Sequence, residues 1–111
     1  MPATQISTDV RSILAEYRRG LEQIYGGRLV RLVLFGSHAR GDASAESDID
    51  VLVVLRGPVH TGEEISRCSE FRAALCLKHN TPISCLYTSE EQFCNEQSPL
   101  MLNVRKEGVA I

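Results

Sequence analysis

Two short apolar runs constrain the fold of this chain more than any other feature. Leu32 to Phe35 is apolar at every position, and a second run over residues 48–55 is closed by Gly57 and Pro58. Alternate side chains of a strand point to opposite faces of its sheet, so consecutive apolar residues are typical of a strand covered on both faces. The runs are far too short to span a bilayer. They predict two central strands of a layered domain.

Helical signals lie before and between these strands. From Ile6 to Ile24, apolar residues recur every three or four positions, which gives one apolar stripe on a helix. Gly26 and Gly27 are expected to end that helix in the left-handed conformation. After the second strand, a Thr61 to Glu64 capping box predicts the start of another helix.

The last third of the chain repeats the alternation. Residues 81–88, "TPISCLYT", predict a third strand. Ser89 with Gln92, and Ser98 followed by Pro99, predict the starts of two further helices. The order α-β-β-α-β-α-α therefore predicts an α/β (α+β) fold, with a small mixed sheet of three or more strands flanked by helices. The length of 111 residues indicates a single domain over residues 1–111.

Composition excludes several classes of protein. At 43% apolar residues the chain is too hydrophobic to be disordered, and its net charge of −2 provides no basic field for nucleic acid. No signal-peptide pattern opens the sequence, which favours the cytoplasm, and no membrane association is expected. The cysteines form no C-x-x-C pair and are expected to be buried free thiols rather than metal ligands or disulfides: Cys68, Cys76, Cys85 and Cys94.

Polar residues of two kinds face each other across the loop between the first two strands. Gly36 lets the backbone approach a ligand closely and Ser37 supplies a hydroxyl, at the start of a helical turn whose N–H groups suit an anion. After ten intervening residues, Asp48 and Asp50 project on one side of the second strand while Ile49 points into the core. Two close carboxylates repel unless a cation such as Mg²⁺ lies between them. The pattern predicts metal-assisted phosphoryl or nucleotidyl transfer.

The same residues resemble a known family. Gly36-Ser37, ten residues, then Asp48-x-Asp50 matches the signature of the DNA polymerase β-like nucleotidyltransferase superfamily, and "GSHARGDASAESDIDVLV" resembles its minimal nucleotidyltransferase branch. The similarity extends through "ISCLYTSEEQF" and "SPLMLNVRKEGV". It implies that Gly36 and Ser37 hold the triphosphate of ATP and that Asp48 and Asp50 are the catalytic, Mg²⁺-binding residues. Arg40 is a further candidate for nucleotide binding, because a guanidinium matches phosphate geometry.

The resemblance also implies a partner. Members of this branch are often antitoxins of helical HEPN ribonuclease toxins, and several transfer AMP from ATP to a tyrosine of the toxin. The larger antibiotic-modifying relatives carry an extra helical domain for their substrate. This chain is expected to lack one, so its acceptor should be held by another protein. Whether the chain forms a homo- or hetero-oligomer stays open.

One residue departs from the superfamily pattern. A third carboxylate usually lies on a neighbouring strand, where it helps to bind metal and to deprotonate the attacking hydroxyl, but the matching strand here has Ser84 in that place. The glutamates that might replace it also read as ordinary helix-start charges: Glu63, Glu64, Glu90 and Glu91. Two hypotheses remain, an enzyme that modifies a partner protein and a weak or inactive nucleotide-binding antitoxin that neutralises its partner by contact.

Overall fold

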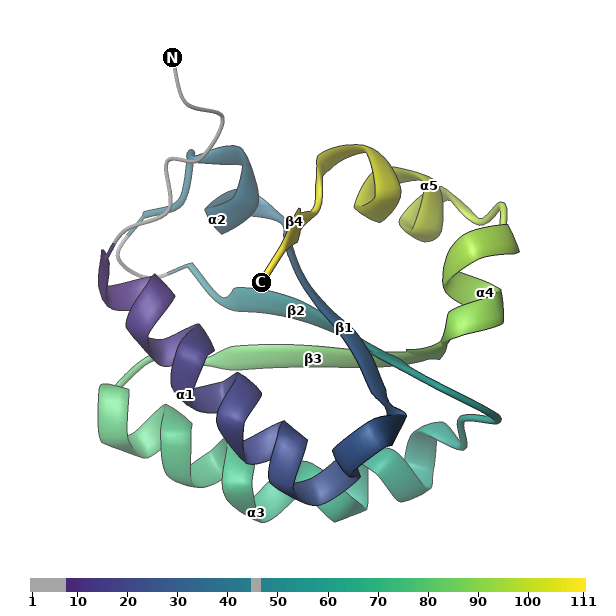
Figure 1. Ribbon diagram of the computed structural model, residues 1–111. Coiled ribbons are helices and arrows are strands. Elements are labelled where there is room, and N and C mark those ends of the chain that lie inside the picture. Colours follow the sequence, from purple (N-terminus) through teal and green to yellow (C-terminus); the bar gives the residue numbers. More distant parts are fainter. Residues whose placement is uncertain (1–7, 45–46) are drawn as a thin grey trace.

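A four-stranded mixed sheet forms the centre of the molecule (Figure 1). In this computed structural model, which describes residues 8–44 and 47–111, the strand order is β3-β2-β1-β4. The central pair β1–β2 and the pair β1–β4 are antiparallel, whereas β2 and β3 are parallel. The predicted fold class is confirmed. The strands are β1 (Leu29–Phe35), β2 (Ile49–Leu55), β3 (Ile83–Ser89) and β4 (Val109–Ala110).

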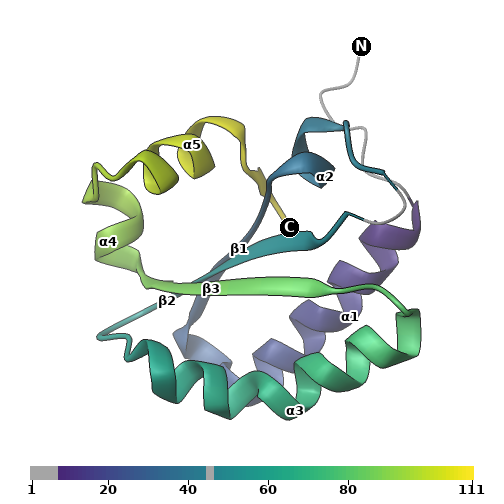
Figure 2. The same cartoon turned by 180° about the vertical axis from the view of Figure 1, so that it is seen from behind.

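Helices cover both faces of this sheet. The long helices α1 and α3 lie side by side on one face, and the short helices α4 and α5 lie over the other (Figures 1 and 2). A single turn, α2, follows β1 at one end of the sheet. The bounds are α1 (Thr8–Tyr25), η1 (Gly26–Arg28), α2 (Ser37–Arg40), α3 (Thr61–His79), α4 (Glu90–Asn95) and α5 (Pro99–Glu107).

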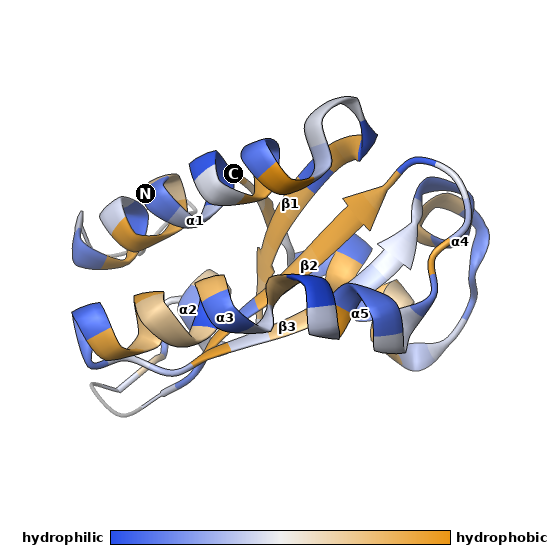
Figure 3. Cartoon of the chain, turned by 90° about the horizontal axis from the view of Figure 1, so that it is seen from below, coloured by the Kyte–Doolittle hydropathy of each residue, from blue (hydrophilic) through white to orange (hydrophobic). Residues whose placement is uncertain are grey.

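The continuous apolar run of β2 is explained by burial on both faces. Val51 and Val53 pack in the core formed with α1 and α3, and Leu52 and Val54 pack in a second core with Met101 of α5. Figure 3 shows the central strands as apolar ribbons between helices whose outward faces are hydrophilic. The two core layers hold β2 firmly, so that the residues at its ends have fixed positions.

Most local predictions are confirmed. Ser89 and Gln92 form both hydrogen bonds of a capping box at α4, and the hydroxyl of Ser98 accepts from the backbone N–H of Met101 at α5. Gly26 takes the left-handed conformation, with φ of 55°, directly after α1. Gly27 does not, and it continues the short helix η1 instead. Ile6, at the start of the predicted stripe, lies outside the described residues.

The predicted Thr61 to Glu64 capping box is wrong. His60 precedes α3 without a side-chain cap, and the carboxylate of Glu64 is buried, where it accepts a hydrogen bond of 2.8 Å from the hydroxyl of Tyr25. Arg67 lies 3.1 Å from the same carboxylate. The spacing of a capping box is present, but the carboxylate of Glu64 bonds to Tyr25 in the core and does not cap the helix.

The cysteine prediction is partly wrong. All four cysteines are free thiols, as predicted, but only Cys68 is buried, and Cys94 is exposed on α4. None of the six residues of α4 is buried, and Cys94 shares the exposure of this short helix. Among the described residues, no helix has the length and apolar character needed to cross a membrane.

β4 lies beyond what the sequence predicted. Val109 and Ala110 pair with Leu34 and Val33 of β1, and the N–H of Ile111 donates to the carbonyl of Leu32. A strand of two residues has no periodicity to detect. It forms because α5 ends beside β1 and returns the chain to that edge (Figure 1).

Candidate active site

The turn after β1 places a glycine against an aspartate. Gly36 has φ of 76° and ψ of −156°, a conformation that is essentially restricted to glycine. A Cβ atom at this position would lie 2.4 Å from Oδ2 of Asp50. The glycine is therefore required twice, by its backbone conformation and by the close approach of the carboxylate. Within the protein, the group that lies close to the backbone of Gly36 is the carboxylate of Asp50. The close approach of a ligand to this glycine stays a prediction.

Asp48 and Asp50 lie on the same side of the entrance to β2. Ile49 between them is fully buried, Asp48 is exposed and Asp50 is half-buried. Burial raises the pKa of Asp50, and the neighbouring charge of Asp48 raises it further, whereas His38 and Arg40 lower it. The two carboxylates therefore repel each other, as expected from the sequence. A divalent cation between them would remove that repulsion.

This repulsion predicts a stability change that can be measured without any ligand. Because the pKa of Asp50 is raised in the folded protein, its ionisation favours unfolding at neutral pH. We expect Asp50→Asn to raise the urea midpoint at pH 7, and the gain to vanish below about pH 4, where the carboxyl is protonated in both states.

Urea unfolding of both proteins between pH 3 and pH 8, without divalent cations, measures this effect. Asp42→Asn is the control, because Asp42 is exposed and pairs with Arg40. It should give no gain. Equal or lower stability of Asp50→Asn at pH 7 would contradict the proposed repulsion.

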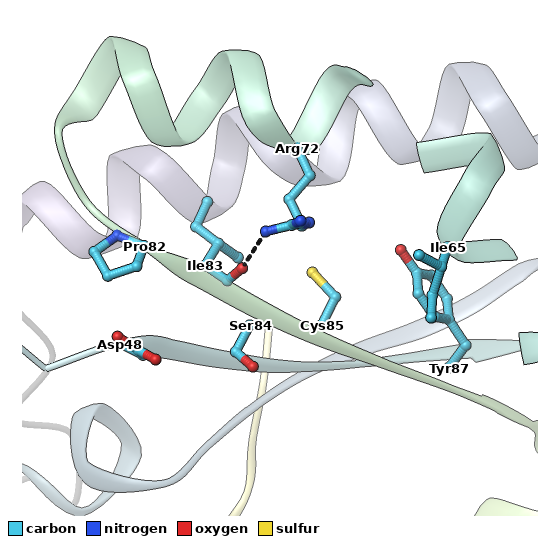
Figure 4. A pocket seen from close by; sticks show the side chains of 8 residues that line it. All are labelled: Asp48, Ile65, Arg72, Pro82, Ile83, Ser84, Cys85 and Tyr87. Atoms are coloured by element: carbon cyan, nitrogen blue, oxygen red, sulfur yellow. Dashed lines mark hydrogen bonds between the residues drawn. The ribbon is translucent and has the colours of Figure 1, made fainter. Parts of the chain in front are cut away.

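Ser84 lies beside Asp50 in the sheet. The parallel register pairs Asp50 of β2 with Ser84 of β3, so both side chains project from the same face. Figure 4 shows the Ser84 side chain pointing to the opposite side of β3 from Cys85. Ser84 therefore lies on the strand next to Asp50 and on the same face of the sheet. That it occupies the place of the third carboxylate stays a prediction.

The four candidate glutamates do not reach this place. Glu64 is held in the core, and Glu90 and Glu91 line a separate cavity with Gly57 and Pro58, beyond the opposite end of β2. Glu63 is in the first turn of α3, which also follows that far end. The seven residues of β2 separate the two ends by roughly 20 Å. These glutamates therefore cannot supply the third carboxylate in this structure.

Arg40 is exposed at the end of α2 and is held by two carboxylates. Its guanidinium lies 3.4 Å from Asp42 and 3.6 Å from Glu107 at the end of α5. These neighbours raise the pKa of Arg40, with Asp42 the larger influence. The charge of Arg40 also lowers the pKa of Asp50. Arg40 is thus placed near the aspartates, paired with anions that a phosphate would replace.

His38 has contacts in the candidate site that the sequence did not predict. Its Nε2 donates a hydrogen bond of 3.1 Å to the carbonyl of Ser47, which ties α2 to the residue before Asp48. Its charge, when protonated, also lowers the pKa of Asp50. No spacing rule marks this histidine as part of the site, because its contacts depend on how the loop folds back.

The chemistry of this site suits a magnesium ion that is shared with a phosphate. In the described part of the chain, no group of three or more histidine, cysteine or acidic side chains is arranged to hold a metal. Two carboxylates alone leave most positions around Mg²⁺ open, and Mg²⁺ commonly fills these with water and substrate phosphates. Asp48 and Asp50 fit that role.

A family model and the most similar known proteins all point to the nucleotidyltransferases. Residues 14–93 match the family described as "Nucleotidyltransferase domain". Over 80 residues the chain is 40% identical to "Putative protein adenylyltransferase MJ0604" of Methanocaldococcus jannaschii, covering 72% of this chain and 74% of that protein. A second protein of the same organism, "Putative protein adenylyltransferase MJ0141", is 33% identical over 76 residues, covering 68% of this chain and 76% of its own length.

Two solved structures share the fold. One is a toxin–antitoxin crystallised with AMP-PNP, with a TM-score of 0.61 and 18% identity over 86% of this chain and 69% of that chain. The other is a mutant of the toxin–antitoxin MntA-HpeT, with a TM-score of 0.58 and 17% identity over 87% of this chain and 70% of that chain.

Proposed function

Since the chain belongs to the nucleotidyltransferase domain family, we propose that it is an Mg²⁺-dependent enzyme that transfers AMP from ATP to a hydroxyl of a partner protein. The observation that carries this proposal is the pair Asp48 and Asp50 at the start of β2, with Asp50 held against the Gly36 turn and its pKa raised. The relatives named as protein adenylyltransferases support the choice of a protein as acceptor. We treat residues 1–111 as one domain with this function.

The residues divide the work of the reaction. The acceptor oxygen forms a bond to the α-phosphorus of ATP, the bond from that phosphorus to the pyrophosphate oxygen breaks, and the hydroxyl proton passes to a base. Asp48 and Asp50 would hold Mg²⁺, which neutralises phosphate charge when it is bound. Gly36, Ser37 and the nearby Arg40 orient the triphosphate.

A toxin is the partner that we propose. The two solved structures of the same fold are toxin–antitoxin assemblies, and one was crystallised with an ATP analogue. The resemblance to the minimal nucleotidyltransferase branch adds that the toxin is a helical HEPN ribonuclease. The cytoplasm is the compartment that we propose for the pair. Nucleic acid is not expected as a direct partner.

Ser84 favours a second candidate function. A serine hydroxyl carries no charge and is a poor proton acceptor, and it lies where the register places a neighbour of Asp50. A protein with this substitution would bind Mg²⁺ and ATP but transfer AMP slowly. It would then neutralise its toxin chiefly by contact.

Calorimetric titration with ATP tests the nucleotide site that both candidates share. We expect wild type to bind ATP at least tenfold more tightly with Mg²⁺ than without, and Asp48→Asn with Asp50→Asn to lose that dependence while remaining folded. The metal contribution is lost because an amide carries no charge to hold Mg²⁺. Glu90→Gln with Glu91→Gln is the matched control, since it removes two carboxylates at the far end of β2. Unchanged Mg²⁺ dependence in the aspartate double variant would refute the assignment.

A further inference from the structure

An open groove runs from Asp48 along the outer edge of β3. Its volume is about 370 Å³, and it lies between β3 and α3 (Figure 4). Asp48 and Ser84 line one end, Ile65 and Tyr87 line the other, and Arg72 reaches over the strand between them. Whatever occupies this groove therefore lies directly beside Asp48, one of the two proposed catalytic carboxylates.

The wall of the groove is an unpaired strand edge. β3 ends the strand order, so no other strand of the described chain pairs with its outer side. Nη1 of Arg72 donates a hydrogen bond of 3.0 Å to the carbonyl of Ile83, which shows that this backbone edge faces the groove. An exposed strand edge is a template for an added extended segment, whose backbone supplies affinity and whose alternate side chains supply specificity.

Charge distinguishes the middle of the groove. Asp48 and Arg72 are the charged side chains that line it. Arg72 is half-buried, and within residues 8–44 and 47–111 it has no acidic partner, whereas Arg40 and Arg67 both have one. Its charge acts on the neighbouring thiol of Cys85, whose pKa it lowers. A half-buried cation without an anion favours a ligand that brings a carboxylate.

The far end of the groove is apolar. Ile65 of α3 is 48% exposed, and it lines the groove with the ring of Tyr87 (Figure 4). An apolar side chain placed there would remove this apolar surface from water, which favours binding. The groove thus offers three different surfaces in a fixed order along one strand.

We propose that this groove binds an extended acceptor segment of the partner protein, an inference that rests on the proposed transfer to a protein hydroxyl. Strand alternation fixes the pattern. The acceptor residue lies opposite Ser84 and points to the face of Asp50. The next residue lies opposite Cys85 and points to Arg72, and the residue three positions from the acceptor lies opposite Tyr87. The segment therefore reads acceptor, acidic, any, apolar, in one of the two chain directions, over roughly 10 Å.

Synthetic peptides test this pattern directly. The probes are two fluorescein-labelled peptides with the cores Tyr-Glu-Ala-Leu and Leu-Ala-Glu-Tyr, and two in which lysine replaces glutamate. Fluorescence anisotropy measures their binding to the protein with saturating AMP-PNP and Mg²⁺. We expect one glutamate peptide to bind wild type at least tenfold more tightly than its lysine counterpart.

Variants of Arg72 identify the contact. Arg72→Glu should reverse the preference, Arg72→Gln should remove it while retaining a donor for the carbonyl of Ile83, and Arg72→Lys should keep it. Arg19→Glu, on the exposed side of α1, makes the same charge change elsewhere and should leave the preference unaltered. AMP-PNP affinity, measured by calorimetry, should stay within twofold in all variants.

The outcomes separate this inference from the function on which it rests. Equal binding of glutamate and lysine peptides by wild type, or no binding of either, with AMP-PNP bound normally, would overturn the groove assignment and leave the nucleotidyltransferase proposal standing. A large loss of AMP-PNP affinity in Arg72→Glu and Arg72→Gln would also overturn it, because the groove would then belong to the nucleotide. Failure of wild type to bind AMP-PNP with Mg²⁺ would remove the proposed function itself.

Discussion

We expect Gly36→Val to weaken Mg²⁺-dependent ATP binding by roughly a hundredfold or more. The backbone conformation at this turn costs a residue with a side chain about 1–3 kcal/mol, and more when the side chain is β-branched. A Cβ atom would also meet Oδ2 of Asp50 at 2.4 Å. Either the turn moves away from the phosphate or Asp50 rotates away from the metal, and both changes damage the same site.

A matched glycine separates this effect from a general loss of structure. Gly62 lies in the first turn of α3, and a Cβ atom there meets nothing within 4 Å. Gly62→Val should bind ATP as wild type does. Calorimetry and urea unfolding of both variants give binding and stability separately. If Gly36→Val does not fold, Ser37→Ala provides the smaller test, with an expected loss on the order of 1 kcal/mol for one hydrogen bond. Normal ATP binding by folded Gly36→Val would place the phosphate site elsewhere.

The central strands and the proposed metal pair were predictable because they depend on short-range rules. Apolar residues at consecutive positions require burial on both faces, and the side chains of β2 are buried in a separate core on each face of the sheet. Asp48 and Asp50 flank the buried Ile49, so strand alternation alone places them together. Ser84 is different, because strand alternation alone does not say which residues of 81–88 share the face of Asp50. The resemblance to the superfamily points to Ser84, and the register of β2 and β3 puts it on that face.

The rest of the site depends on contacts between distant segments, which no local pattern encodes. Arg40 meets Glu107 because α5 ends beside α2, and Arg72 meets the carbonyl of Ile83 because α3 packs along the sheet edge. Glu64 has the spacing of a capping residue, yet its carboxylate is buried and accepts a hydrogen bond from the hydroxyl of Tyr25 at the end of α1. Tertiary packing decided each of these cases over local propensity.

Ser84→Asp is expected to raise the rate of AMP transfer by roughly 10² to 10⁴, the usual contribution of a positioned general base. In the register of β2 and β3, the new carboxylate would project beside Asp50, where it can complete the metal shell and accept the proton of the acceptor hydroxyl. Ser84→Asn is the matched control, because it has a similar shape without the charge. Transfer of label from α-³²P-ATP to the co-purified partner measures the rate for all three proteins.

The same substitution predicts a change that does not depend on turnover. A further carboxylate beside Asp50, whose pKa is already raised by burial and by Asp48, adds like-charge repulsion. Ser84→Asp should therefore be less stable than wild type at pH 7 without Mg²⁺ and should gain more stability when Mg²⁺ is added, because binding to the folded state stabilises it. Ser84→Asn should show neither effect.

Robust transfer by wild type that Ser84→Asp leaves unchanged or abolishes would show that Ser84 does not occupy the place of the third acid. If neither protein transfers label while the toxin stays neutralised, the chain acts by binding its partner.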